Sequence, residues 1–185
     1  MEGNNPLALR VKWPYAQQFG LLGGFLVIGV TLIMYLFAGD SVSLQKQGLF
    51  SLASFILIFV LAHRAVKSYR NEHLGGFIHF KDAFQVAALA GGLCGFLGSL
   101  FNLIYLTYVD AGYVDLLIRQ MEEMYLNMGM SEGDVEKALE KMKEGFSTRS
   151  LAMGLVTGPT IYGLVVGLVG GLIGRKKNPA LDADL

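Results

Sequence analysis

Three histidines and an aspartate are the side chains of this sequence best suited to a metal ion. His63, His73 and His79 lie on one polar stretch, and Asp82 follows three residues after the last of them. Two glycines separate His73 from His79, and neither a nearby cysteine nor an H-x-x-x-H pair completes a common zinc-ligand pattern. We therefore expect no metal, no bound cofactor and no catalytic residue, so the chain is predicted not to be an enzyme.

Methionine thioethers offer a second kind of chemistry. Met121, Met124, Met128 and Met130 carry soft sulfur ligands that could bind Cu(I). Methionines at helical spacing more often form an adaptable apolar face. A metal-binding sensor is therefore kept as the third of three functional hypotheses.

The elements that would position these groups are dominated by one long uncharged stretch. Residues 83–109 include no charged side chain, and as a helix they would reach roughly 40 Å, against a hydrocarbon layer of about 30 Å. The chain is 53% hydrophobic and only 16% charged, which is too apolar for an ordinary soluble domain of this size. Its formal net charge is zero, so nucleic acid is not an expected partner.

We predict an all-α membrane protein with four transmembrane helices in a single membrane domain, residues 1–185. The spans are expected at about residues 17–38, 44–62, 83–109 and 150–174. Between the third and fourth spans, residues 110–149 form the only sizeable polar section. This section is predicted to be an extracytoplasmic hairpin of two amphipathic helices.

Apolar side chains recur along the predicted hairpin at the spacing of a helix face. Gly129 is expected to end the first helix, and an S-x-x-D cap formed by Ser131 and Asp134 to begin the second. Such faces suit a hairpin packed on itself, on the membrane surface or on another protein. The possible docking face consists of Leu117, Met121, Met124, Met128, Val135, Leu139 and Met142.

Lysine and arginine are distributed unevenly around the spans. Residues 1–15 carry two, the loop of residues 63–82 four and residues 175–185 three, whereas the turn of residues 39–47 carries one. The positive-inside rule therefore places both termini and the middle loop in the cytoplasm. Trp13 and Tyr15 beside Arg10 and Lys12 are typical of an anchor at the membrane interface.

The middle loop is also a candidate for contact with lipid. Between Phe77 and Phe84, aromatic and polar residues are interleaved, which predicts a short element lying along the headgroups. Charge that only sets topology is the alternative explanation for the cations of this loop. The possible contacts with anionic lipid are Arg64, Lys67, Arg70 and Lys81.

Glycines four residues apart recur in the third and fourth spans. Small residues let helix backbones approach closely in lipid, which favours either a tight bundle or a homo-oligomer formed through the same face. The face comprises Gly91, Gly95, Gly163, Gly167 and Gly171.

Few polar groups lie within the predicted spans. Pro159 lacks an amide donor and is predicted to kink the fourth span. The third span carries Ser99, Asn102, Tyr105 and Thr107, which fit hydrogen bonding between helices or a path for a neutral solute. The first, third and fourth spans contain no acidic or basic residue, so proton coupling through them is not expected.

Three segments together resemble a known family. They are the G-F-I-x-F-K-x-A-F run of residues 76–84, the Met-rich turn before the second amphipathic helix, and the Gly-rich last span with its basic end. Over roughly residues 13–177 the chain is similar to the bacterial domain-of-unknown-function family 4199. The resemblance implies a small, multi-pass protein of a bacterial inner membrane, of the Bacteroidetes kind, and it assigns no functional residue.

Three functions remain open from the sequence. The leading hypothesis is a non-catalytic accessory or scaffold subunit of a membrane assembly, with the hairpin as its docking surface. The alternative is a small transporter or lipid-handling protein that acts as a homo-oligomer, ahead of the metal-binding sensor. The expected partners are the lipid bilayer and either a second copy of the chain or another membrane protein.

Overall fold

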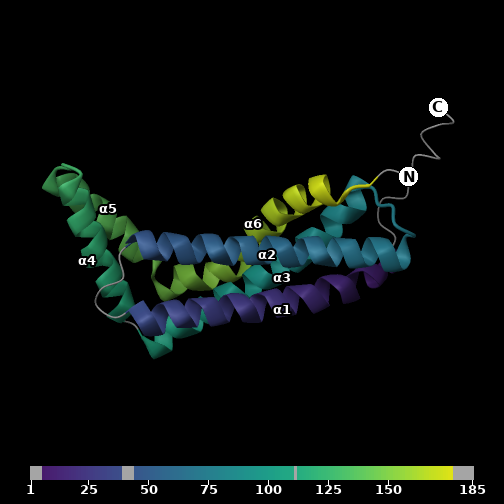
Figure 1. The fold of residues 1–185 in the computed structure, drawn as a ribbon. Coiled ribbons are helices and arrows are strands. Elements are labelled where there is room, and N and C mark those ends of the chain that lie inside the picture. Colours follow the sequence, from purple (N-terminus) through teal and green to yellow (C-terminus); the bar gives the residue numbers. More distant parts are fainter. Residues whose placement is uncertain (1–5, 39–43, 111, 177–185) are drawn as a thin grey trace.

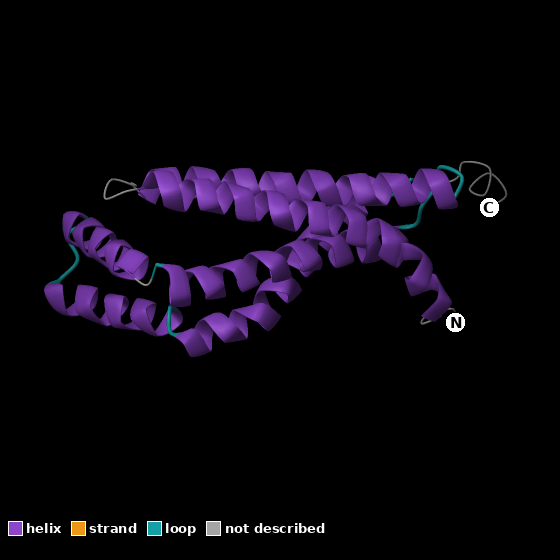
Figure 2. Cartoon of the chain, turned by 90° about the horizontal axis from the view of Figure 1, so that it is seen from below, coloured by secondary structure: helices purple, strands orange, loops and turns teal. Residues whose placement is uncertain are grey.

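In the parts of the chain that it describes, the computed structural model consists of six α-helices and one short π-helical segment (Figure 1). The structure describes residues 6–38, 44–110 and 112–176. Within these ranges the chain is drawn as helices and loops with no strand (Figure 2), and the only pairing of β type is an isolated bridge between Ile78 and Lys176. The helices are α1 (Pro6–Ala38), α2 (Leu44–His73), α3 (Phe80–Ile104), η2 (the π-helical Tyr105–Val109), α4 (Gly112–Asn127), α5 (Glu132–Gly145) and α6 (Thr148–Gly174).

Four of these helices are long and apolar enough to cross a membrane. They cover Arg10–Leu36, Lys46–His73, Phe80–Val109 and Thr148–Gly174. Large apolar side chains point outward along them: Phe25 is 64% exposed, and Leu36 and Val156 are each 71% exposed. Soluble proteins rarely expose continuous apolar surface, whereas lipid favours it. The predicted fold class, an all-α membrane protein with four spanning helices, is confirmed.

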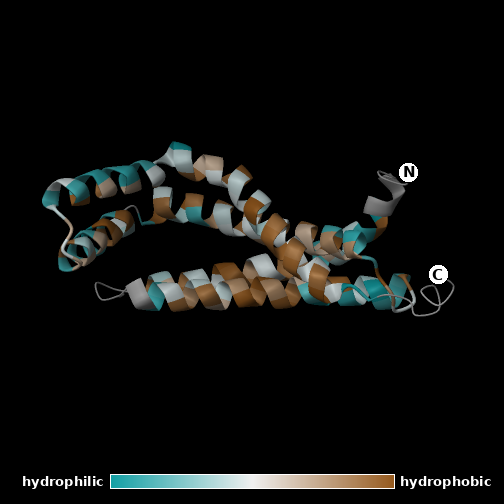
Figure 3. Ribbon diagram, turned by 90° about the horizontal axis from the view of Figure 1, so that it is seen from above, coloured by the Kyte–Doolittle hydropathy of each residue, from teal (hydrophilic) through white to brown (hydrophobic). Residues whose placement is uncertain are grey.

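The bundle has two polar ends with an apolar region between them. The first turns of α1, the α2–α3 connection and the last turn of α6 gather at one end, which we call the termini end (Figure 1). The α4–α5 hairpin lies at the opposite end, which we call the hairpin end. Hydrophilic residues concentrate at both ends, and hydrophobic ones occupy the long helices between them (Figure 3).

At the termini end, the helices extend beyond the apolar stretches from which the spans are predicted. Helix α1 begins at Pro6, and α2 continues to His73 through a polar segment. The structure contains no separate interfacial element between Phe77 and Phe84, so that prediction is wrong. Ile78 instead exchanges two backbone hydrogen bonds of 3.0 Å with Lys176, and Phe80 already opens α3.

Helix α3 lies at the centre of the bundle and packs most extensively against α6. The glycines make this contact possible, because a Cβ built at Gly170 would lie 2.6 Å from the Cβ of Ala87. Likewise, a Cβ built at Gly91 would lie 2.8 Å from the Cβ of Val166. Packing this close excludes any larger residue unless the helices move apart.

The predicted glycine face is therefore occupied inside one chain. A Cβ at Gly95, Gly163, Gly167 or Gly171 would lie 2.8–3.0 Å from atoms of the facing α3 or α6. All five glycines of this face thus serve the α3–α6 contact within the bundle. A homo-oligomer of this chain would have to use another surface.

Candidate functional site

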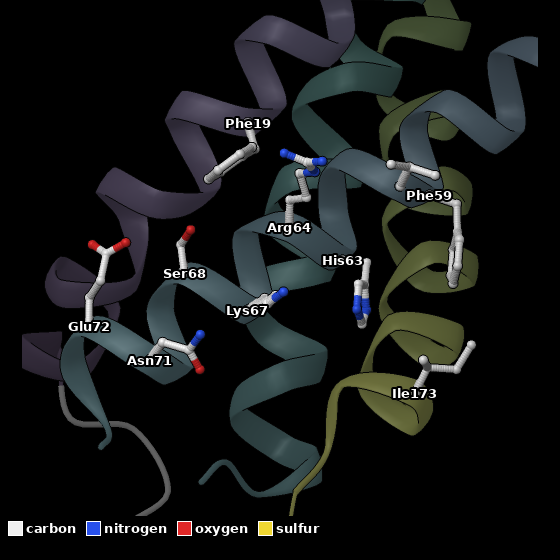
Figure 4. Close-up of a pocket in the computed structure, with 10 residues that line it drawn as sticks. Phe19, Phe59, His63, Arg64, Lys67, Ser68, Asn71, Glu72 and Ile173 are labelled. Atoms are coloured by element: carbon white, nitrogen blue, oxygen red, sulfur yellow. The ribbon is translucent and has the colours of Figure 1, made fainter. Parts of the chain in front are cut away.

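A groove at the termini end brings together cations and apolar side chains. It has a volume of about 540 Å³ and follows the outer face of α2, between Phe19 of α1 and Ile173 of α6 (Figure 4). Arg64 and Lys67, two of the four predicted lipid contacts, line it and are exposed. We call this site the α2 groove.

The lining of the α2 groove changes in polarity along the helix axis. Phe59 and Val60 lie nearest the middle of the bundle, Arg64 and Lys67 follow, and Glu72 lies farthest out. The distance from Arg64 to Glu72 corresponds to about 12 Å along a helix. His63, Ser68, Asn71 and Ile173 complete the lining. The order is therefore apolar, then cationic, then polar with one carboxylate.

The other two predicted lipid contacts lie outside the groove. The Nη1 of Arg70 donates a hydrogen bond of 3.4 Å to the carbonyl of Gly174, the last residue of α6. A cation at this position satisfies a terminal carbonyl and complements the helix dipole. Lys81 is exposed on the first turn of α3. Only two of the four cations thus share one cavity.

A partly buried ion pair, which the sequence does not reveal, connects α1 to α3. The ammonium of Lys12 lies 2.5 Å from a carboxylate oxygen of Asp82 and 2.5 Å from the side-chain oxygen of Gln85. The side chain of Lys12 is 4% exposed, and that of Asp82 is 34% exposed. The sequence predicts that Lys12 belongs to an interfacial anchor. It does not reveal the ion pair, because the partner of Lys12 lies 70 residues away in the chain.

A second cavity lies between the helices in the half of the bundle nearer the hairpin. It has a volume of about 260 Å³ and is bounded by α1, α2, α3 and Tyr162 of α6. Asn102 and Ser99, from the predicted polar cluster of the third span, both line it. The hydroxyl of Tyr35 donates a hydrogen bond of 2.7 Å to Oδ1 of Asn102. We call this site the bundle cavity.

Aromatic rings close the bundle at the hairpin end. Tyr35 stacks on Tyr105 with ring centroids 4.3 Å apart and meets Tyr113 edge-on at 4.6 Å. Burial, with added repulsion from Tyr105 and Asp110, raises the pKa of Tyr113 above its ordinary value. Its hydroxyl has no hydrogen-bond partner within the described part of the chain. The π-helical turn that carries Tyr105 replaces the last turn of the expected α-helical span.

Helices α4 and α5 form a hairpin, and most of the predicted docking face is buried within the chain. The Ser131 hydroxyl accepts a hydrogen bond from the amide of Asp134, as its S-x-x-D pattern predicts. Val135 and Leu139 are buried with Ile118 inside the hairpin, and Met121 packs against them. Leu117 is buried in the aromatic cluster at the hairpin end, where Met142 is partly buried. Met124 is partly exposed, and Met128 is 69% exposed.

A groove remains between the two hairpin helices. It has a volume of about 660 Å³, with a floor of buried apolar residues that includes Ile118, Val135 and Leu139. Carboxylates form most of its rim, with a single lysine, Lys143. We call this site the hairpin groove. Its acidic residues are Glu122, Glu132, Glu136 and Glu140.

Two of the four candidate metal ligands of the middle loop contact other groups. Asp82 pairs with Lys12, and the ring of His73 stacks on Tyr69 at 5.7 Å. Among the described residues, no three His, Cys, Asp or Glu side chains lie close enough together to hold a metal ion.

Pro159 lies on the fourth span at its contact with α3. Helix α6 is continuous from Thr148 to Gly174 through this proline. The carbonyl of Pro159 is the nearest atom to a Cβ built at Gly92, at 3.4 Å. The predicted kink thus falls on the α3–α6 interface.

Four apolar spanning helices around a glycine-packed core define an integral membrane protein of the multi-pass α-helical class. The family of proteins of unknown function DUF4199 matches residues 18–176, so the chain belongs to that family and the resemblance of its sequence segments is confirmed. No curated protein and no solved structure matches the chain.

Proposed function

We propose that this chain is a lipid-handling membrane protein that binds the headgroup of an anionic phospholipid in the α2 groove. The observation that carries the proposal is the pairing of Arg64 and Lys67 in one cavity with Phe59, Val60 and Ile173. A phospholipid presents the same sequence of groups, with acyl chains first and the phosphate next. The polarity of the groove therefore complements a lipid that lies alongside α2.

The two cations differ in the way they would bind a phosphate. An arginine can place two parallel N–H donors on phosphate oxygens, whereas a lysine acts as a compact point charge. Both side chains have apolar stems that can pack along α2 while their charged ends reach the headgroup layer. Each such cation contributes about 1 kcal/mol near an anionic surface.

Removing both charges tests the proposal. We expect Arg64→Gln/Lys67→Gln to bind phosphatidylglycerol roughly 10- to 30-fold more weakly, since two contacts of about 1 kcal/mol each are lost. The measurement is a lipid titration of the purified protein followed by native mass spectrometry.

The matched control is Lys81→Gln/Arg175→Gln. It removes two exposed cations from the same end of the molecule, outside the groove. Equal weakening in the two double variants would mean that general surface charge, and not the groove, attracts the lipid.

We further propose that the termini end faces the cytoplasm of a bacterial inner membrane. The first turns of α1, the α2–α3 region and the described residues after α6, Arg175 and Lys176, carry most of the cations that flank the spans, and they gather at this end. This distribution supports a groove that opens to the cytoplasmic leaflet.

The second candidate is an accessory subunit that docks a partner on the hairpin, and the hairpin groove favours it. Because the predicted docking face is largely buried, the binding surface proposed now is the groove itself. Its apolar floor and acidic rim complement a basic amphipathic helix of a partner protein.

Variants of carboxylates inside and outside the hairpin groove distinguish binding in the groove from a general effect of surface charge. We expect Glu122→Gln/Glu140→Gln to lose a stoichiometric partner that the native protein retains after mild extraction. Glu123→Gln/Glu144→Gln, on the same two helices but outside the groove, should retain it. If the native protein carries no stoichiometric partner, the candidate fails.

A further inference from the structure

We propose that the bundle cavity is a binding site for a small, uncharged molecule that both donates and accepts hydrogen bonds. The site is distinct from the α2 groove, because no residue lines both. The proposal rests on the volume of the cavity, on its uncharged lining and on the hydroxyl-bearing residues that line it from several helices.

The cavity is large enough for a ligand of a few heavy atoms. Its volume of about 260 Å³ equals the space of roughly eight water molecules at their liquid volume. Its walls come from the second half of α1, the first half of α2, the second half of α3 and Tyr162. A molecule here would lie within the bundle, in the half nearer the hairpin.

The lining is polar without being charged. None of the lining residues is Asp, Glu, Lys, Arg or His. Some of the polar groups already have partners: Nδ2 of Asn102 donates to the Gly98 carbonyl at 3.0 Å, and the Thr31 hydroxyl donates to the Val27 carbonyl at 2.9 Å.

Three serine hydroxyls at the cavity have no hydrogen-bond partner among the described residues, and that of Ser99 also faces Gly158 of α6. Ser51 and Ser54 of α2 and Ser99 of α3 line the cavity, and none of them makes a hydrogen bond within the described residues. Each hydroxyl offers one donor and two acceptor positions. A polyol or amide of small size can satisfy these groups, and in a low-dielectric site each hydrogen bond is stronger than in water.

Other occupants fit the lining less well. An acyl chain would leave the three hydroxyls without partners, which is costly away from water. A bare ion would find no countercharge in the lining. The chemistry therefore points to a neutral, hydrogen-bonding ligand, with water alone as the competing occupant.

The reactivity of the only cysteine of the chain can be used to measure access to this cavity. Cys94 lines it and is 2% exposed, and its thiol donates a hydrogen bond of 3.2 Å to the Gly20 carbonyl. An uncharged thiol reagent, methyl methanethiosulfonate, should reach Cys94 through the cavity in the purified full-length protein. Its anionic sulfonatoethyl analogue should not react.

Glycerol is the probe ligand. We expect it to slow the reaction along a saturating curve, about tenfold at ten times the midpoint concentration, as occupancy of a single site requires. Sucrose, which is too large for the cavity, should leave the rate unchanged. If glycerol slows the reaction no more than sucrose does, the cavity holds water only and the proposal is overturned.

A cavity-filling variant provides an independent test. Gly98 lines the cavity, and the nearest atom to a Cβ built there is 4.0 Å away, so Gly98→Leu can fill the space without a backbone clash. It should slow the reaction at least about tenfold, comparable with a saturated site. Gly29→Leu is the control, since a Cβ there meets no atom within 4 Å. An equal rate in Gly98→Leu and the native protein would also overturn the proposal.

Discussion

Lys12 is 3% exposed, although its neighbours Arg10 and Trp13 are exposed. At the residue scale, the sequence identifies the cations near the membrane surface but not their partners. Arg64 and Lys67 line the α2 groove, Arg70 bonds the end of α6, and Lys12 pairs with Asp82. These three roles depend on which residues from distant parts of the chain become neighbours, and no local pattern encodes that information.

Replacing Asp82 should lower the unfolding free energy more than replacing Lys12. Asp82→Asn leaves a nearly fully buried ammonium without a countercharge, which costs about 3 kcal/mol of unfolding free energy. Lys12→Met leaves a carboxylate that is 34% exposed and can be hydrated, so its cost is about 1 kcal/mol. Unfolding by sodium dodecyl sulfate in mixed micelles measures both values.

The double variant Lys12→Met/Asp82→Asn distinguishes charge burial from simple packing loss. We expect it to be more stable than Asp82→Asn alone, because no uncompensated charge remains. Additive losses in the double variant would contradict this explanation.

At the scale of the elements, apolar length and helix caps are readable from sequence. The uncharged stretches predict the four long helices, and the Ser131 cap is found where its pattern places it. The helix ends at the termini end are missed because polar residues extend α1 and α2 beyond the apolar stretches. The spacing of the glycines identifies the glycine face. It does not decide whether the α3 and α6 parts of that face pack on each other or on a second copy of the chain.

Two glycines of α6 give a direct test of the helix interface. Gly170→Leu places new atoms against Ala87 of α3, where a Cβ would lie 2.6 Å away, and should destabilise the bundle by about 1–3 kcal/mol or more. Gly154→Leu adds the same atoms where no neighbour lies within 4 Å. Its stability should stay within about 0.5 kcal/mol of the native value.

The comparison is made by thermal unfolding of both variants in one detergent. Similar losses in the two variants would show that leucine disturbs α6 by itself, without involving the contact with α3.

At the scale of the whole molecule, the count of spans and the grouping of basic ends are predictable, because both follow from hydropathy and charge along the chain. The α2 groove and the bundle cavity are not predictable in this way. Each is lined by at least three helices, so it exists only after the bundle forms. The polar residues of the third span indicate part of the bundle cavity, but the serines of α2 carry no such signal.

The orientation proposed for the molecule can be measured with single cysteines. In a Cys94→Ala background, Glu123→Cys on the hairpin should react with a membrane-impermeant maleimide in spheroplasts with intact inner membranes. Lys81→Cys at the termini end should react only after the membrane is permeabilised. The opposite pattern would place the basic end outside and contradict the proposed orientation.

The contact between α3 and α6 also constrains the order in which the protein can be made. The third span leaves the ribosome well before its main partner, because the whole hairpin is synthesised between them. The bridge between Ile78 and Lys176 closes later still, since Lys176 lies beyond the last span. During this interval the glycine surface of α3 has no helix to cover it and must be shielded by lipid or by the insertion machinery. Assembly of the bundle is therefore completed only after the last span has entered the membrane.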